Sequence, residues 1–400
     1  MRILIVSSYF PPEICPGAFR IGELSRGLTR MGNEVTVLTC NPRYPRGFKF
    51  PRPTGKHQSY KWHEVRVEEF AIPTGKESPI SQALEQFRFY VDGLKVARRF
   101  VRPDVVIATS PFFSAVCLGL RIAERWDCPF IYDIRDLYPD VLKFQRLPFS
   151  TVVYPYLKRW ANRLYKSATF VVVNQPSLLA TVSKWVDGHR LRMLMNPVIL
   201  PEMTSPRLPK TKSSFAVGYA GRWGRGYDFP TLLSTIRLAD PSRFTFYLVG
   251  GGYWKEEVRK FSEENPPNLR VHYGWVRQKE LAEHYASWDI AILPVEPRWC
   301  ACLWPTKLPE LIAYGIVVII PPELALPQAL ETSRLIVRAE KATAEGYGKA
   351  LEEATIRIQT LTPEDYSIAR ETVRYEFSPE RLTEGYMEVI TLSGAKDSNP

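Results

Sequence analysis

Histidine and cysteine are scarce in this chain of 400 residues, and both scarcities limit its chemistry. None of the five histidines lies in an HExxH motif or has a partner at metal-ligand spacing, so we expect them to be structural or exposed. Of six cysteines only Cys300 and Cys302 are close together, and a C-x-C pair without further ligands is a poor zinc site. The sequence therefore predicts no metal, and its scattered cysteines are typical of a reducing, cytoplasmic compartment.

Long hydrophobic runs are also missing. A membrane-spanning helix needs about 18 consecutive apolar residues or more. The longest candidate, LIAYGIVVII, is too short and contains Gly315. The opening residues lack the charged start and the long apolar segment of a secretory signal. We therefore expect a protein that neither crosses a membrane nor is exported.

Acidic residues are fewer than basic ones only in the first half of the chain. Residues 1–200 hold 29 Lys and Arg against 16 Asp and Glu, whereas residues 201–400 hold 24 against 26. An excess of positive charge attracts nucleic acid, anionic lipid or phosphorylated ligands, and it also serves mere solubility. The two segments 81–101 and 143–166 mix basic with aromatic residues. Each suits either a membrane surface or a core helix with a solvated face, and together they favour peripheral contact with an anionic membrane.

Strand-like and helix-like segments alternate in both halves, which predicts the α/β class with mostly parallel sheets and helices on both faces. A stretch rich in Pro, Ser and Thr interrupts this alternation at 201–214 and predicts a linker. We thus expect one domain at 1–200, a second at 215–378, and a tail helix at 379–400 after the break at Phe377 to Pro379. Ligands of such sheets bind beyond the carboxyl ends of the strands.

The first predicted strand, RILIVSS, is followed by an unusual turn. Tyr9, Phe10 and two prolines come next, and only Gly17 is available in place of the G-x-G-x-x-G fingerprint of nicotinamide enzymes. The turn takes about ten residues where two to six are usual. A dehydrogenase is therefore disfavoured.

Two turns of the second half suit a diphosphate. In AGRWGRGYDF, Arg222 and Arg225 lie among glycines that allow a close backbone approach, although solvated arginines fit this turn equally well. In LWPTKLPELIAYG, Thr306 and Lys307 stand where a helix begins, and Glu310 lies one turn on, able to accept from a pair of ribose hydroxyls. A Lys307–Glu310 surface pair is the simpler alternative.

A third cluster, in YDIRDLYPD, ends a buried strand of the first half. It contains Asp133, Arg135, Asp136 and Asp140. A carboxylate there suits proton transfer or the stabilisation of an electron-poor centre. An internal Arg–Asp pair that ties the loop is the structural alternative.

Together these motifs resemble glycosyltransferase family four. YFPPEICPGAFRIGELSRGLTRMGNEVTVLT is similar to the opening of that family, and NPRYPRG follows where members have a similar stretch. RDLYPD resembles the RDLWPE motif of one branch of the family, the bacterial lipopolysaccharide and capsule enzymes that are similar to the N-acetylfucosaminyl transferases. AGRWGRGYDFPTLL resembles the donor loop of the same enzymes, and PTKLPELIAYG resembles their PSKLFEYMAxG motif. The resemblance implies the GT-B fold, with two Rossmann-like domains facing each other across a cleft, and retaining, metal-independent transfer of a hexosyl or N-acetylhexosaminyl group.

The resemblance also implies roles for particular residues. The donor, a UDP-sugar, is bound by Gly17, Arg222, Arg225, Val276, Thr306, Lys307 and Glu310. Arg20 and Arg135 lie on the acceptor side, and Asp136 is the catalytic or sugar-positioning carboxylate. The implied acceptor is a polyprenyl-diphosphate-linked saccharide at the inner face of the plasma membrane, in surface polysaccharide biosynthesis. No cofactor and no nucleic acid are implied.

Two departures from the family leave other functions open. Cys302 stands where many members have a glutamate eight residues before Glu310, and Tyr227 stands where a lysine is common. A small-molecule or natural-product transferase, a sugar-nucleotide 2-epimerase of the same fold, and a degenerate non-catalytic scaffold are therefore alternatives.

Overall fold

The computed structural model describes residues 1–44, 50, 55–73, 78–140, 150–198, 200, 212–274 and 276–395. They form two compact units: unit 1 is Met1–Pro197 with Pro379–Pro400, and unit 2 is Val198–Ser378. Most of the predicted linker, and parts of the NPRYPRG stretch and of the 143–166 segment, lie outside the described residues. Each unit is described by itself.

Unit 1 contains an eight-stranded sheet in the order β3-β4-β2-β1-β5-β6-β7-β8. Every pairing is parallel except that of β3 with β4, which confirms the predicted mostly parallel sheet. The strands are β1 (Arg2–Val6), β2 (Glu34–Cys40), β3 (His57–Trp62), β4 (Val65–Phe70), β5 (Val105–Thr109), β6 (Phe130–Ile134), β7 (Phe170–Val173) and β8 (Leu191–Met193).

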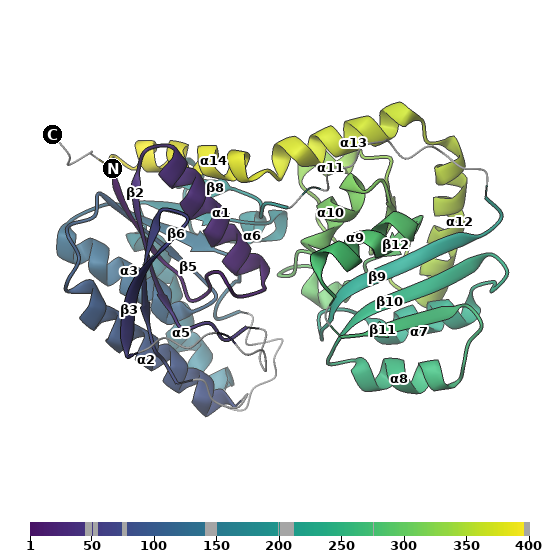
Figure 1. The fold of residues 1–400 in the computed structure, drawn as a ribbon, viewed down its shortest axis with the longest axis horizontal. Helices are drawn as coiled ribbons and strands as arrows, with labels where there is room; N and C mark the ends of the chain where they lie inside the picture. Colours follow the sequence, from purple (N-terminus) through teal and green to yellow (C-terminus); the bar gives the residue numbers. More distant parts are fainter. Residues whose placement is uncertain are drawn as a thin grey trace. The chain divides into compact units, whose positions relative to one another are not determined.

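Helices cover both faces of this sheet (Figure 1). One face carries α1 (Pro16–Arg30) and α14 (Pro379–Leu392), so the end of the chain packs beside its beginning. A Cβ on Gly27 would lie 2.1 Å from the Thr383 hydroxyl, so glycine is what permits this close approach. The other face carries α2 (Pro79–Ala97), α3 (Phe113–Trp126), α5 (Ser150–Ser167) and α6 (Pro176–Val182).

Unit 2 contains a six-stranded parallel sheet in the order β11-β10-β9-β12-β13-β14. Its strands are β9 (Phe215–Trp223), β10 (Phe244–Gly252), β11 (Leu269–Tyr273), β12 (Ile290–Ile292), β13 (Val317–Ile320) and β14 (Ile336–Arg338). Its helices are α7 (Phe229–Leu238), α8 (Lys255–Glu263), α9 (Gln278–Ser287), α10 (Lys307–Ala313), α11 (Gln328–Glu331), α12 (Ala344–Thr360) and α13 (Pro363–Glu376).

The strand order of each sheet reverses beside its first strand. In unit 1, β1 lies between β2 and β5, and in unit 2, β9 lies between β10 and β12. Open α/β sheets bind ligands outside the carboxyl ends of the strands at such a reversal. The loops that follow β1, β5, β9 and β12 are therefore the places to look for a site.

Within the described part of the chain, no helix combines the length and the hydropathy that crossing a bilayer requires.

Candidate functional site

Lys307 is the centre of a small polar cluster in unit 2. It is the first residue of α10, and Thr306 precedes it as the N-cap. The Lys307 Nζ donates to the Tyr285 hydroxyl at 3.1 Å and lies 3.9 Å from Glu310 Oε2. Tyr285, on α9, donates to Glu310 at 3.5 Å. The predicted donor residues Lys307 and Glu310 thus share a third partner, Tyr285, that the motif alone did not indicate.

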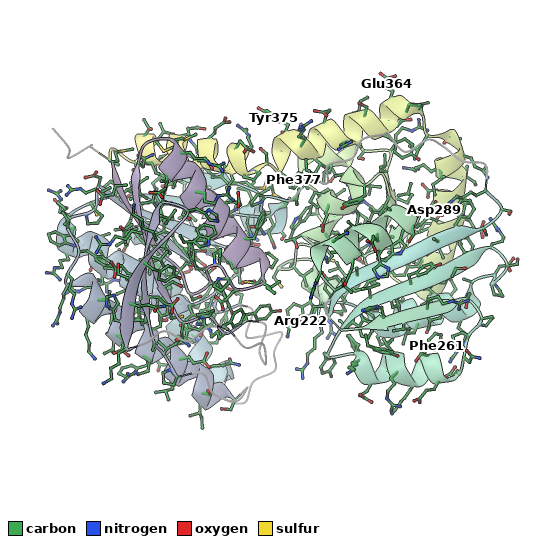
Figure 2. The ribbon with its side chains drawn as sticks, viewed as in Figure 1. Arg222, Phe261, Asp289, Glu364, Tyr375 and Phe377 are labelled. Carbon is green, nitrogen blue, oxygen red and sulfur yellow. The ribbon has the colours of Figure 1, made fainter. Side chains whose placement is uncertain are left out.

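The carboxyl end of β9 reaches the same cluster. Gly221 has a φ of 142°, and a Cβ there would lie 3.0 Å from Lys307 Cε, so the lysine packs over the end of β9. Arg222 follows directly, is exposed, and accepts from the Tyr219 hydroxyl through its carbonyl oxygen at 2.9 Å. Figure 2 shows Arg222 at the end of β9. The structure therefore places Lys307, at the start of α10, against the end of β9 next to Arg222, at the strand-order reversal of unit 2.

Burial sets the electrostatics of this cluster. The side chains of Lys307 and Glu310 are 30% and 20% exposed. Desolvation lowers the pKa of Lys307, and Glu310 opposes this change. Desolvation likewise raises the pKa of Glu310, against the effect of Lys307. Each group thus favours its neutral form more than it does in water, so a bound anion would stabilise the charge on Lys307.

The other predicted residues of unit 2 lie further from Lys307 along the sheet or the chain. Arg225 is exposed and stacks on Tyr253, with 4.4 Å from its guanidinium carbon to the ring centroid. Val276 is half-buried in the loop after β11, two strands away from β9. Tyr227 forms an isolated β-bridge with Val295, which joins the loops that follow β9 and β12. The residue in the place of the family's lysine is therefore part of the scaffold of the site.

In unit 1, Gly17 and Arg135 come together although they are far apart in the sequence. Gly17 lies in the first turn of α1, and Arg135 follows β6. A Cβ on Gly17 would lie 2.0 Å from Arg135 Nη1. The absence of a side chain at position 17 is thus what leaves room for the guanidinium.

Asp136 lies on the same loop and is held by its backbone. The Ser110 hydroxyl accepts from the backbone N–H groups of Arg135 and Asp136, at 2.8 and 3.1 Å. Burial raises the pKa of the Asp136 carboxyl, although the charge of Arg135 opposes the rise. A carboxyl of raised pKa beside a fixed cation suits the predicted role in proton transfer.

The prediction that Arg20 faces a substrate is wrong. Its side chain is fully buried, and its Nη2 lies 3.0 Å from Oδ1 of Asp133, which is also fully buried. The same guanidinium donates to the carbonyl oxygens of Leu194 and Met195 and to the Tyr386 hydroxyl of α14. Arg20 therefore ties α1, β6 and α14 together and has no surface to offer a ligand.

Two of the five histidines, His57 and His63, lie in an edge hairpin of unit 1. His57 begins the edge strand β3 and its Nε2 lies 2.7 Å from Glu68 Oε2, while His63 lies in the turn that leads to β4. The stretch HQSYKW has no apolar run, so hydrophobic periodicity gave no strand signal there.

Sequence reasoning missed the residue that fixes the long turn after β1. Glu13 is buried, and its carboxylate accepts from the backbone N–H groups of Phe10, Arg43 and Tyr44 at 3.0 to 3.2 Å. It thereby joins the β1–α1 loop to the segment after β2. The length of the turn thus has a structural cause: the loop is tied back to a neighbouring loop before α1 begins.

The protein resembles known glycosyltransferases in sequence and in fold. Residues 17–198 match the Glycosyl transferase 4-like domain family. The "Uncharacterized 41.2 kDa protein in cps region" of Klebsiella pneumoniae is 25% identical over 191 residues, which are 43% of this chain and 50% of that protein. The chain thus spans half the length of this curated relative.

Solved structures cover nearly the whole chain. Sucrose-phosphate synthase from Thermosynechococcus elongatus superimposes with a TM-score of 0.73 at 15% identity, over 99% of both chains. HepE of Anabaena in complex with UDP has a TM-score of 0.67 at 13% identity, over 98% of this chain and 100% of that one. The lipopolysaccharide outer core galactosyltransferase WaaB has a TM-score of 0.67 at 12% identity, over 98% and 99%. The chain therefore has the GT-B fold, and its residues 17–198 match the glycosyl transferase 4-like domain.

Proposed function

We propose that this protein transfers a sugar from a nucleotide-sugar donor to an acceptor, with retention of configuration. One observation carries the proposal: Lys307 and Glu310 of α10 form a polar cluster with Tyr285 of α9, and Lys307 packs against Gly221 at the carboxyl end of β9, next to Arg222. These are the residue types that a diphosphate and a ribose require. The UDP complex of HepE and the sugar nucleotide named for another neighbour, UDP-2-fluoro glucose, favour a UDP-sugar as donor.

The chemistry follows from where charge develops. Departure of the nucleotide diphosphate places negative charge on its distal phosphate, and positive groups fixed there lower the barrier. Lys307, with Thr306 beside it, and the arginines at 222 and 225 supply the hydrogen-bond donors. We propose no metal and no cofactor for this step, because these cations carry the required charge. Glu310 accepts from the ribose, and the backbone at Val276 lies against the base.

Unit 1 is proposed to hold the acceptor. Asp136 is its candidate catalytic or sugar-positioning carboxylate, and Gly17 lets the start of α1 approach a phosphate. The capsule-region relative and the lipopolysaccharide transferase among the similar structures favour surface polysaccharide biosynthesis and a polyprenyl-diphosphate-linked saccharide as acceptor. The finer resemblance to N-acetylfucosaminyl transferases stays a prediction.

Two exposed faces of unit 1 support docking to a membrane. Ile80, Leu84 and Phe87 share one side of α2 and are 82%, 49% and 63% exposed. Tyr156 and Trp160 are exposed on α5, a helix whose sequence has four Lys and Arg and no acidic residue. Apolar and aromatic side chains beside cations are typical of an interfacial helix. We therefore propose a peripheral site on the anionic cytoplasmic face of the plasma membrane.

The first experiment is turnover of a panel of nucleotide sugars. We expect one donor to be hydrolysed or transferred, and Lys307→Ala to lower its turnover by about 10²–10³. Lys349→Ala is the matched control, because Lys349 is exposed and pairs with Glu340 away from the cluster. If the folded protein neither binds nor turns over any donor, the assignment fails and the scaffold alternative takes its place. Conversion of the donor to its epimer without acceptor identifies the epimerase instead.

Sedimentation with vesicles tests the membrane part separately. We expect binding to vesicles rich in phosphatidylglycerol and weak binding to neutral ones. The double variant Phe87→Ser with Trp160→Ser should lose it, whereas Ile368→Ser should not, since Ile368 is an equally exposed apolar residue of unit 2. A transferase that ignores vesicles of both kinds is the small-molecule enzyme.

A further inference from the structure

Tyr285 joins the two charged residues of the proposed donor site. Lys307 Nζ donates to its hydroxyl at 3.1 Å, and the hydroxyl donates to Glu310 Oε2 at the longer distance of 3.5 Å. Burial raises the pKa of the Tyr285 phenol well above its ordinary value, so the group is a neutral hydroxyl at physiological pH. A neutral hydroxyl both accepts and donates, so one oxygen can serve the ammonium and the carboxylate together.

Lys307 and Glu310 do not form a direct hydrogen bond. They stand three residues apart on α10, a spacing at which a lysine and a glutamate of one helix usually pair. Their atoms Nζ and Oε2 are nevertheless 3.9 Å apart, which exceeds the length of about 2.7–3.2 Å of an N–H···O hydrogen bond. Among the described residues, Nζ donates to Tyr285 alone. The other N–H groups of the ammonium therefore remain for a ligand.

Packing fixes the position of the Tyr285 hydroxyl. The side chain is fully buried, and its ring contacts Trp288 and Tyr314, with 5.3 and 5.1 Å between the ring centroids. Trp288 is also fully buried, and it fills the space beside Gly218, where a Cβ would lie 2.0 Å from the indole. The hydroxyl therefore cannot withdraw from the two charged side chains that it bridges.

We propose that Tyr285 is a positioning residue of the donor site, whose hydroxyl keeps Lys307 and Glu310 from closing into an ion pair. The proposal rests on the proposed function and adds a residue to it. In a closed pair, the carboxylate would neutralise the ammonium that the diphosphate needs, and the ammonium would occupy the oxygen that the ribose needs. The neutral hydroxyl gives each group a partner without cancelling either charge.

The neighbouring hydroxyl groups do not replace this bridge. Burial raises the pKa of Tyr219 on β9 and of Tyr314 on α10, so both are neutral at physiological pH. The Tyr219 hydroxyl donates to a carbonyl oxygen of its own strand. Within the described part of the chain, no hydrogen bond joins either hydroxyl to Lys307 or Glu310. Removal of the Tyr285 hydroxyl would therefore drive Lys307 toward Glu310.

A double-mutant cycle on UDP binding to the full chain tests this role. Tyr285→Phe removes the hydroxyl and keeps the ring. We expect it to weaken UDP binding about tenfold, because the closed pair must first be broken. Glu310→Gln removes the carboxylate and lowers the affinity by itself. In that background Tyr285→Phe should weaken binding less than about twofold, since no carboxylate is left to pair with Lys307.

The pH dependence of UDP binding gives a second readout, which a change of packing alone would not move. Desolvation lowers the pKa of Lys307 in the parent, so its affinity falls at alkaline pH. Direct pairing with Glu310 would favour the ammonium, so in Tyr285→Phe the fall should begin at a higher pH. Tyr347→Phe is the matched control, because Tyr347 is buried in the same unit and its hydroxyl has no hydrogen-bond partner among the described residues. It should change neither the affinity nor the pH profile.

Two results in variants that circular dichroism shows to be folded would overturn the positioning role. They are an unchanged affinity in Tyr285→Phe, and equal losses of affinity in the parent and Glu310→Gln backgrounds. Donor turnover by the parent together with either result keeps the proposed function and rejects this role alone. A folded parent that neither binds UDP nor turns over any donor rejects the proposed function, and the role of Tyr285 with it.

Discussion

The two units place charged residues at the carboxyl edges of similar sheets but use them differently. In unit 1 the central pair, Arg20 with Asp133, is fully buried and fully bonded. In unit 2 the corresponding cluster of Lys307 and Glu310 keeps part of its surface, and Arg222 beside it is exposed. The comparison teaches that a charged residue at a strand end can bind a ligand or take part in catalysis only where its polar atoms remain accessible.

The net charge also differs between the two units. Unit 1 holds 31 Lys and Arg against 20 Asp and Glu, whereas unit 2 holds 22 of each. Unit 1 therefore carries a net positive charge, which attracts anions, whereas the charges of unit 2 balance. This matches the division that we propose, with a nucleotide on unit 2 and an anionic membrane on unit 1.

The largest expected effect is on the stability of unit 1. Arg20→Met leaves Asp133 buried without its partner, which costs about 3–5 kcal/mol. Urea unfolding followed by tryptophan fluorescence measures the change. The double variant with Asp133→Asn should recover part of the loss, because it removes the stranded charge. A stable Arg20→Met that loses acceptor binding would show instead that Arg20 acts on a ligand.

The corresponding substitution in unit 2 should impair catalysis and leave the stability of the protein nearly unchanged. Lys307→Ala should lower kcat by about 10²–10³, as removal of one fixed donor to a developing anion does elsewhere. Its effect on the free energy of unfolding should stay below about 1 kcal/mol, since the Lys307–Glu310 pair is partly solvated. Lys349→Ala should leave both quantities unchanged. A large loss of stability would make Lys307 a structural residue like Arg20 and erase the contrast between the units.

Sequence reasoning succeeded where the partners are local. Thr306, Lys307 and Glu310 are neighbours on one turn, so their motif predicted their association and the start of α10. Arg20 failed because its partners Asp133 and Tyr386 are 113 and 366 residues away, and no pattern in the sequence joins them. Arg135 and Gly17 meet for the same reason, through the position of β6 in the sheet, so only the structure reveals their contact.

A smaller effect is expected on the pH dependence of donor binding. Desolvation lowers the pKa of Lys307, so in the free protein this lysine loses its proton at a lower pH than a lysine in water. Binding of a diphosphate requires the ammonium form, so affinity for UDP should fall as the pH rises through the lowered pKa. Lys307→Arg should retain its affinity to about pH 10, because a guanidinium stays protonated there. If the affinity for UDP falls in the same way at alkaline pH in the parent and in Lys307→Arg, another group controls binding.

The smallest effect is expected at Arg225. Its guanidinium lies on the Tyr253 ring in solvent, an interaction worth about 0.5–1 kcal/mol, so little holds it away from a ligand. An exposed charge also contributes little, so Arg225→Gln should raise the donor KM only about two- to fivefold, with the change shrinking at high salt. Arg237→Gln, which removes another exposed arginine of unit 2 paired with Glu264, should have no effect. A loss comparable to that of Lys307→Ala would mean that the loop after β9 closes over the bound donor and desolvates Arg225.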